Sequence, residues 1–183
     1  MKIYMVRHGQ TDSNVAKKIM GQRIDESLNQ EGRRQAHELS DSLKGTAFDV
    51  IFSSPLKRVL ETAKVVAEGR TAKILTRDEL KERDFGSLSG KTQQEAAEIL
   101  GITVEKMRAA DYEQKFDYRP FGGESAAEVR TRFLKFIEEV KRDYAGKRVL
   151  VVTHAGISRL AHLLFRESAV EHIKNATLEE FDI

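Results

Sequence analysis

The sequence has no cysteine and no tryptophan, and only two of its 183 residues are proline. The absence of cysteine excludes disulfides, thiolate catalysis, zinc ribbons and iron–sulfur clusters. Its apolar runs are far shorter than the roughly 18–20 residues of a membrane-spanning helix, and the N-terminus lacks the features of a signal peptide. We therefore expect a cytoplasmic protein without membrane contact, and interpret the Asn175-Ala176-Thr177 glycosylation motif as a chance match.

An excess of charge of one sign is also missing. Lysine and arginine total 31 against 29 acidic residues, a net charge of +2. A nucleic-acid-binding domain usually has a basic stripe on a clearly basic chain, so we expect no nucleic-acid partner. The hydrophobic share of 40% is sufficient for a core, and the length suits one domain spanning residues 1–183.

Short β-favouring runs alternate with longer helical stripes along the chain. Apolar runs predict strands at 3–6, 48–52, 72–76, 149–152 and 177–183. Apolar residues at three- and four-residue steps predict helices over 36–43, 56–67, 129–144 and 157–164. The alternation predicts an α/β fold, a three-layer α/β/α sandwich around a mostly parallel sheet.

The segment from about 90 to 121 interrupts this alternation. Its two helical stretches, 91–100 and 103–112, are polar. Insertions of this kind often lie over the carboxyl ends of strands, where α/β proteins bind ligands. We expect a lid-like insertion, with a solvated excursion that has no role as the alternative.

Two histidines follow directly on predicted strands. His8 comes after the first strand and His154 after the apolar run at 149–152. Because the carboxyl ends of adjacent parallel strands meet at one sheet edge, we expect both imidazoles in one crevice. Backbone carbonyls would satisfy a purely structural histidine, but two at equivalent positions, one preceded by Arg7, favour a functional site. The other three histidines are predicted to be exposed: His37, His162 and His172.

A third strand end places Arg58 at the start of a predicted helix. The positive end of the helix dipole does not stabilise a structural arginine at this position. It does stabilise an anion that the arginine binds, so the position favours an anion-binding role. Together with Arg7, His8 and His154 it would surround a dianionic phosphate or sulfate. A metal site is disfavoured, because the histidines lack metal-ligand spacing and the arginines would repel a cation.

A carboxylate for proton transfer is harder to choose. Glu82 lies in a charged stretch with Glu79 and Asp84 on either side. Periodicity does not distinguish the three, and a run of charges is usually a solvated face.

These residues belong to motifs that resemble those of the histidine phosphatase superfamily, in its phosphoglycerate mutase-like branch. The first motif is Arg7-His8-Gly9-Gln10-Thr11, followed by Asn14, and the last is Val152-Thr153-His154-Ala155-Gly156. Between them lie matches at Asp25, Leu28, 31–36, 53–58, 62–63, 80–86 and 122–125. The motifs occur in family order over almost the whole chain, a combination far more specific than Arg-His-Gly alone.

The resemblance implies a phosphoglycerate mutase-like fold and a role for each site residue. His8 would accept the phosphoryl group, and Glu82 would donate a proton to the leaving group. Arg7, Arg58 and His154 would bind the phosphate and act in catalysis. Substrate contacts are implied for Arg7, Asn14, Gly21, Arg58, Glu82, Ala155 and Gly156. The implied partner is a small phosphorylated molecule, and neither a metal nor another cofactor is implied.

The departures from the family pattern concern the choice between two reactions. Mutases of the family have a lysine where this chain has Gln93, and an arginine pair where residues 107–112 offer only Arg108. We therefore expect a metal-independent phosphatase that forms a phosphohistidine on His8, with a phosphoglycerate mutase as the alternative. A non-catalytic phospholigand-binding module is a third reading, disfavoured because it would need neither His8 nor Glu82.

Overall fold

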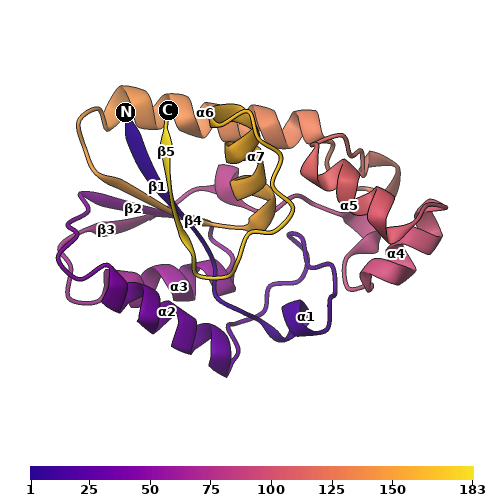
Figure 1. The fold of residues 1–183 in the computed structure, drawn as a ribbon, viewed down its shortest axis with the longest axis horizontal. Helices are drawn as coiled ribbons and strands as arrows, with labels where there is room; N and C mark the ends of the chain where they lie inside the picture. Colours follow the sequence, from indigo (N-terminus) through magenta and orange to yellow (C-terminus); the bar gives the residue numbers. More distant parts are fainter.

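A five-stranded sheet forms the centre of the computed structural model, which describes residues Met1–Ile183 (Figure 1). The strands are β1 (Lys2–Arg7), β2 (Val50–Ser53), β3 (Lys73–Thr76), β4 (Val149–Thr153) and β5 (Leu178–Asp182). Their spatial order is β3-β2-β4-β1-β5, and all neighbours are parallel except β5, which runs antiparallel to β1. The predicted strands and the mostly parallel sheet are confirmed.

Helices cover both faces of this sheet (Figure 1). One face packs on α2 (Gln30–Ser42) and α3 (Lys57–Ala67), and the other on α6 (Ala126–Asp143) and α7 (Ala155–Phe165). Alternate residues of β4 point to opposite layers, so that Val149 and Val151 pack below α6 and α7 while Leu150 and Val152 pack below α2 and α3. The apolar run in β4 is buried throughout because helices lie on both sides, as predicted for a three-layer sandwich.

Local sequence signals set the helix starts. Ser125 and Glu128 form a capping box at α6, in which the Glu128 carboxylate accepts from the Ser125 amide at 2.8 Å. Asn29 caps α2 by accepting from the amide of Gly32 at 2.8 Å. A Cβ on Gly32 would lie 2.0 Å from the carbonyl oxygen of Gln10, so only glycine lets α2 approach the loop that follows β1.

The strand order places a crevice between β1 and β4. The connection that leaves β1 leads to β2 on one side of this pair, and the connection that leaves β4 leads to β5 on the other side. The two connections therefore diverge between β1 and β4. Arg7 pairs with Thr153 at the ends of the two strands, and the amide of His8 donates to the Thr153 carbonyl at 3.0 Å. His8 and His154 are the residues that follow the two strands, and they therefore lie side by side.

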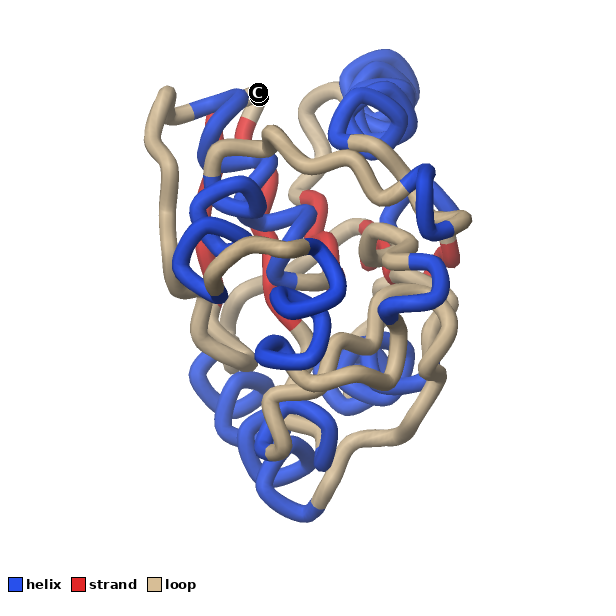
Figure 2. Tube along the Cα trace, turned by 90° about the vertical axis from the view of Figure 1, so that its right-hand side faces the viewer, coloured by secondary structure: helices blue, strands red, loops and turns tan.

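Shorter elements surround this edge of the sheet. They are α1 (Asp12–Val15), α4 (Gln93–Leu100), α5 (Val104–Tyr112) and the 3₁₀ turns Asp78–Leu80, Gly86–Leu88 and Arg119–Phe121. Helices α4 and α5 lie at the right of Figure 1, and Figure 2, viewed from that side, shows the strands behind a front of helices and loops. None of the helices has both the length and the apolar character needed to cross a bilayer.

Candidate active site

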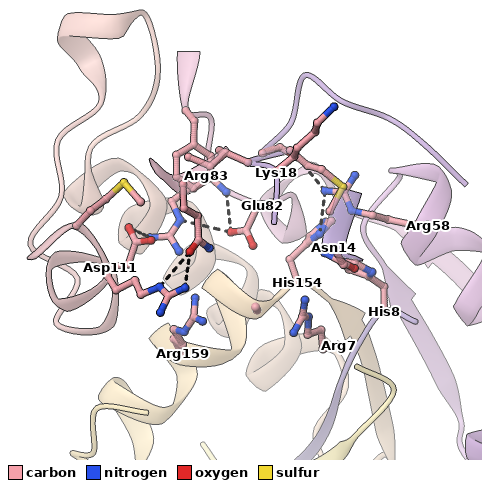
Figure 3. A pocket seen from close by; sticks show the side chains of 18 residues that line it. Arg7, His8, Asn14, Lys18, Arg58, Glu82, Arg83, Asp111, His154 and Arg159 are labelled. Atoms are coloured by element: carbon pink, nitrogen blue, oxygen red, sulfur yellow. Dashed lines mark hydrogen bonds and ion pairs between the residues drawn. The ribbon is translucent and has the colours of Figure 1, made fainter. Parts of the chain in front are cut away.

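The ends of the strands open into a pocket of roughly 760 Å³, counted with its open mouth (Figure 3). Most of the residues predicted from the sequence line it: Arg7, His8, Asn14, Gly21, Arg58, Glu82, His154 and Ala155. They come from segments as far apart as β1 and the start of α7. The strand-end argument predicted this meeting for Arg7, His8, Arg58 and His154, and the family resemblance implied the others. No group of three or more histidine, aspartate or glutamate side chains is arranged to hold a metal ion.

His8 is buried, with 3% of its surface exposed. Its Nδ1 lies 2.7 Å from the carbonyl oxygen of Gly9. Because a carbonyl only accepts hydrogen bonds, Nδ1 carries the proton and Nε2 keeps its lone pair. Burial, together with His154, Arg58 and Arg7, holds the pKa of His8 well below its ordinary value, so the imidazole is neutral at pH 7.

His154 is fully buried beside His8, and the two ring centroids are 5.3 Å apart. Its Nδ1 accepts from Arg58 Nη2 at 3.3 Å, and its Nε2 lies 2.9 Å from the hydroxyl oxygen of Ser54. Burial and the Arg58 charge hold the pKa of His154 well below its ordinary value. These contacts fix the ring orientation next to the nucleophile candidate.

Arg58 is held by backbone carbonyls from a distant loop. Its Nη1 donates to Ile24 at 2.9 Å and its Nη2 to Gly21 at 2.8 Å. Gly21 has φ +55°, and a Cβ there would lie 2.8 Å from the Arg83 carbonyl oxygen. Only glycine therefore fits at the position whose carbonyl binds Arg58. The guanidinium is thereby aimed into the pocket although its residue is only 1% exposed.

Arg7 and Arg58 both offer unused donors. Arg7 Nη1 donates to the carbonyl of Ile173, but the Nε atoms of both arginines are buried and have no acceptor within the protein. Both arginines line the pocket, so their guanidinium groups place positive charge where an anion would bind. Burial and the charge of Arg159 lower the pKa of Arg7 to about 10, which leaves it protonated at neutral pH.

Glu82 faces the two histidines from the other side of the pocket (Figure 3). Its Oε2 accepts from the Gly156 amide and its Oε1 from the Arg83 amide, both at 3.0 Å. Burial acts to raise the pKa of Glu82, but the Arg83 guanidinium and these amides outweigh it and lower the pKa below its ordinary value. The carboxylate is therefore ionised in the free site.

Geometry selects Glu82 from the three neighbouring carboxylates. Glu79 pairs with Lys135 at 3.4 Å and Asp84 with Arg23 at 2.9 Å, and neither lines the pocket.

Gly156, which is also an expected substrate contact, lies beside Glu82. Its amide is bound to Glu82, it does not line the pocket, and a Cβ would lie 2.1 Å from Glu82 Oε1. Its role in the structure is to hold the carboxylate.

Comparison with known proteins agrees with this geometry. The family model "Histidine phosphatase superfamily (branch 1)" matches residues 3–182. The chain belongs to the histidine phosphatase superfamily.

Its relatives within the superfamily include both phosphatases and mutases. It is 33% identical to phosphoserine phosphatase 1 of Hydrogenobacter thermophilus, over 84% of this chain and 71% of that protein. It is also 33% identical to the 2,3-bisphosphoglycerate-dependent phosphoglycerate mutase of Parvibaculum lavamentivorans, over 86% of this chain and 76% of that protein. Among solved structures, a mycobacterial glucosyl-3-phosphoglycerate phosphatase in complex with VO3 aligns with a TM-score of 0.84 at 26% identity, covering 98% and 91% of the two chains.

Two asparagines support the histidine phosphatase site. The Oδ1 atom of Asn14 accepts from the amide of Thr11 at 3.1 Å, so its NH₂ group is what it offers to the pocket. Asn175 donates through Nδ2 to the carbonyl oxygen of His8 at 2.8 Å. The sequence analysis interpreted Asn175 only as part of a chance glycosylation motif, and no local pattern links it to a residue 167 positions earlier.

Further pocket residues were not predicted from the sequence. Arg83 is 3% exposed and forms a salt bridge with Asp111 at 2.8 Å, and Arg159 comes from the second turn of α7. Helices α4 and α5 add Gln93, Met107 and Arg108, so part of segment 90–121 forms a wall of the pocket. Whether that wall moves as a lid stays a prediction. Each residue lies on a helix or turn of ordinary composition, so only the tertiary fold reveals it.

One histidine was placed wrongly. His37 and His172 are exposed as predicted, but His162 is 5% exposed and its Nε2 lies 2.6 Å from Glu179. The reason is that β5 packs against α7, which buries a wider stripe of the helix than its apolar residues indicate.

Proposed function

We propose that this protein is a metal-independent phosphomonoesterase that forms a phosphohistidine on Nε2 of His8. The observation that carries the proposal is the contact between His8 Nδ1 and the Gly9 carbonyl at 2.7 Å. It leaves an unprotonated Nε2 in a pocket that the guanidinium groups of Arg7 and Arg58 also line. A neutral nucleophile beside fixed cations suits attack on a phosphate dianion.

In the first step, Nε2 of His8 attacks phosphorus and the bond from phosphorus to the ester oxygen breaks. Arg7 and Arg58 bind the phosphoryl oxygens, the NH₂ group of Asn14 adds a hydrogen bond, and His154 joins them when its Nε2–H exchanges the Ser54 hydroxyl for a phosphoryl oxygen. The two guanidinium groups are in place before the reaction, so they stabilise the transition-state charge without reorganisation. The fixed cations supply the electrostatic stabilisation that magnesium provides in other phosphoryl transfers.

Glu82 serves both half-reactions. Once protonated, it gives its proton to the departing alkoxide. The resulting carboxylate then takes a proton from water as the water oxygen attacks phosphorus and the bond to His8 breaks, which releases inorganic phosphate and restores the starting proton. The low pKa of Glu82 in the free site suits the second step, and the charge of a bound phosphate dianion raises that pKa for the first.

The wall of the pocket favours hydrolysis over phosphoryl transfer to a second hydroxyl. At the position where mutases of the family have a lysine, Gln93 accepts hydrogen bonds from Arg108, with Nη2 at 2.6 Å. The single arginine of α5 is thus bound to a neutral amide instead of standing in a cationic pair. Phosphoglycerate mutase remains the alternative because such mutases are among the relatives.

The decisive experiment follows both outcomes at once. The protein is incubated in EDTA with 3-phosphoglycerate, with and without 2,3-bisphosphoglycerate as a primer, and products are followed by phosphorus NMR. We expect inorganic phosphate and no 2-phosphoglycerate, with p-nitrophenyl phosphate hydrolysed in parallel at a rate that EDTA does not change. Primer-dependent 2-phosphoglycerate would show a mutase, and activity lost in EDTA but restored by magnesium or zinc would contradict the mechanism.

Asn175 gives a further prediction. Removing its hydrogen bond to the His8 carbonyl by Asn175→Ala is expected to lower kcat about tenfold with little change in KM, the effect of one buried hydrogen bond worth ~1–2 kcal/mol. Asn175→Asp, which sets a carboxylate oxygen against the carbonyl, should be worse. Lys174→Ala, at the exposed position beside it, is the matched control. A KM effect without a kcat effect would show that Asn175 does not position the nucleophile.

A further inference from the structure

The insertion at 90–121 reaches the neighbourhood of Glu82 through a buried salt bridge. Asp111, in the last turn of α5, accepts through Oδ1 from Arg83 Nη1 at 2.8 Å. The hydroxyl of Tyr118 donates to the same oxygen at 3.0 Å. In the view of Figure 3, Arg83 lies between Asp111 and Glu82, so one guanidinium is shared by the charges of two carboxylates.

The guanidinium of Arg83 hydrogen-bonds to Asp111 alone. Its Nε is buried, has no acceptor within the protein and lies 3.8 Å from Glu82 Oε1, beyond hydrogen-bonding distance. The rings of Phe85 and Phe116 lie against the guanidinium, with centroids 5.2 and 4.6 Å from its central carbon. The salt bridge to Asp111 and the two rings therefore hold Arg83 just short of a hydrogen bond with Glu82.

The charges around Glu82 come from every side of the pocket. The cations of the lining are Arg7 (β1), Lys18, Arg58 (α3), Arg83, Arg108 (α5) and Arg159 (α7), and Asp111 is its only other carboxylate. From α6, Arg132 donates to the Glu82 carbonyl at 3.1 Å, but Glu124 pairs with it at 2.9 Å. Both histidines are neutral at pH 7. Burial acts to raise the pKa of Glu82, and among the charges that outweigh it the Arg83 guanidinium contributes most.

We propose that Asp111 is a positioning residue for proton transfer: by binding Arg83, it limits the pairing of that guanidinium with Glu82 and so keeps Glu82 able to take up and donate a proton. This rests on the proposed phosphatase function and adds a residue to its chemistry. Without the Asp111 charge, Arg83 would be a buried cation with Glu82 as its remaining partner, and it would hold that carboxylate ionised. The insertion then takes part in proton transfer as well as in the wall of the pocket.

The test measures proton donation by Glu82 as a function of pH. An alkyl phosphate needs a proton on its leaving oxygen and p-nitrophenyl phosphate hardly does. The ratio of their single-turnover rates of His8 phosphorylation, each expressed per substrate dianion, therefore follows the protonated fraction of Glu82. Titration of the histidines affects both substrates alike and cancels in this ratio. The ratio rises as the pH falls, and Asp111→Asn should move the rise to lower pH by about one unit.

Two further variants separate this effect from a loss of structure. Asp111→Glu restores the charge and should return the rise to its wild-type pH. Glu113→Gln, which removes one exposed acid directly after α5, is the matched control and should leave the rise in place. A purely structural role would lower the rates with both substrates and leave the pH of the rise unchanged. An unchanged pH in a folded Asp111→Asn protein overturns the inference.

The route through Arg83 is tested by Arg83→Gln, alone and combined with Asp111→Asn. Arg83→Gln should move the rise to higher pH, because Glu82 loses the strongest of the charges that lower its pKa. Adding Asp111→Asn should then have no further effect, since Asp111 acts through the guanidinium. A one-unit shift by Asp111→Asn in both backgrounds overturns this route.

The same pair of variants keeps the inference testable if Asp111→Asn alone does not fold. Asp111→Asn leaves a buried arginine unpaired, and arginine cannot lose its charge in compensation. Arg83→Gln leaves Asp111 unpaired instead, and burial already raises the pKa of Asp111, so that it can take up a proton. Coincident pH profiles for Arg83→Gln and the double variant support the inference, and profiles that differ by a unit contradict it.

A titration of Glu82 itself separates a failure of this inference from a failure of the proposed function. The ¹³C resonance of its carboxyl group, assigned by its absence in Glu82→Gln, is followed against pH in the ligand-free protein and with inorganic phosphate. Asp111→Asn should lower the midpoint by about one unit whether or not any phosphomonoester is hydrolysed. Equal midpoints in the wild-type and Asp111→Asn proteins overturn the inference and leave the phosphatase function standing.

Discussion

Replacement of His8 by alanine is expected to abolish turnover of every phosphomonoester, with kcat/KM reduced at least ~10⁴-fold. The reason is that no other side chain in the pocket offers an unprotonated nitrogen in the same place. His154 cannot substitute, since Arg58 occupies one of its ring nitrogens and Ser54 the other. The wild-type protein, quenched during turnover of a ³²P-labelled substrate, should carry label that is labile to acid and stable to alkali. His8→Ala should carry none.

The exposed His37 on α2 provides the matched control, and His37→Ala should retain both turnover and labelling. A thermal melt of His8→Ala verifies that the fold survives loss of the buried ring. Normal labelling in a folded His8→Ala protein would assign the nucleophile to another residue.

The second large effect concerns Glu82. An alkyl phosphate releases a strongly basic alkoxide, whereas p-nitrophenolate leaves with little need of a proton, and general acid catalysis contributes roughly 10²–10⁴-fold where it matters. Glu82→Gln should therefore slow single-turnover phosphorylation of His8 by an alkyl phosphate about 10²–10⁴-fold more than phosphorylation by p-nitrophenyl phosphate. Single-turnover conditions are necessary because Glu82 also activates the water of the second step, which slows steady-state turnover of both substrates.

The structure sharpens the choice of variants. Both carboxylate oxygens of Glu82 accept from backbone amides, so glutamine turns its NH₂ group against one of these donors. Glu82→Ala is the companion variant without that conflict, and it should show the same difference between substrates. Glu79→Gln and Asp84→Asn are the controls, because both side chains lie outside the pocket. Equal losses with the two substrates, or a larger loss in a control, would contradict the role of Glu82.

The pKa of Glu82 also sets a pH dependence. Because this pKa is lowered, the carboxylate is ionised in the free enzyme at neutral pH, and its protonated fraction grows as the pH falls towards the pKa. The wild-type ratio of alkyl to aryl phosphorylation rates should therefore rise as the pH falls from 8 to 5. In Glu82→Gln the ratio should be flat once each rate is expressed per substrate dianion, because the titrating group is gone. The correction is necessary in both proteins, since an aryl phosphate loses its second proton at a lower pH than an alkyl phosphate.

Local sequence was sufficient for the scaffold and for the centre of the site. The continuous apolar run of β4 predicted a strand covered on both faces, and the three- and four-residue steps predicted α2, α3, α6 and α7. Once the sheet is parallel, geometry alone requires residues that follow β1 and β4 to meet, which is how His8 and His154 were found. These features follow from periodicity, because periodicity records which face of an element is buried.

Contacts between distant segments decided the rest. Glu82 was distinguished from Glu79 and Asp84 by its place in the pocket, where the amide of Gly156, 74 residues away, holds its carboxylate. The tautomer of His8 was set by the direction of a backbone carbonyl. Arg159 and Asn175 occupy unremarkable positions on a helix and in a loop, and they reach the site because α7 and the chain before β5 pack against the ends of the strands. A carboxylate or guanidinium acquires its role from the donors, acceptors and charges around it, and in this protein those neighbours come from other parts of the chain.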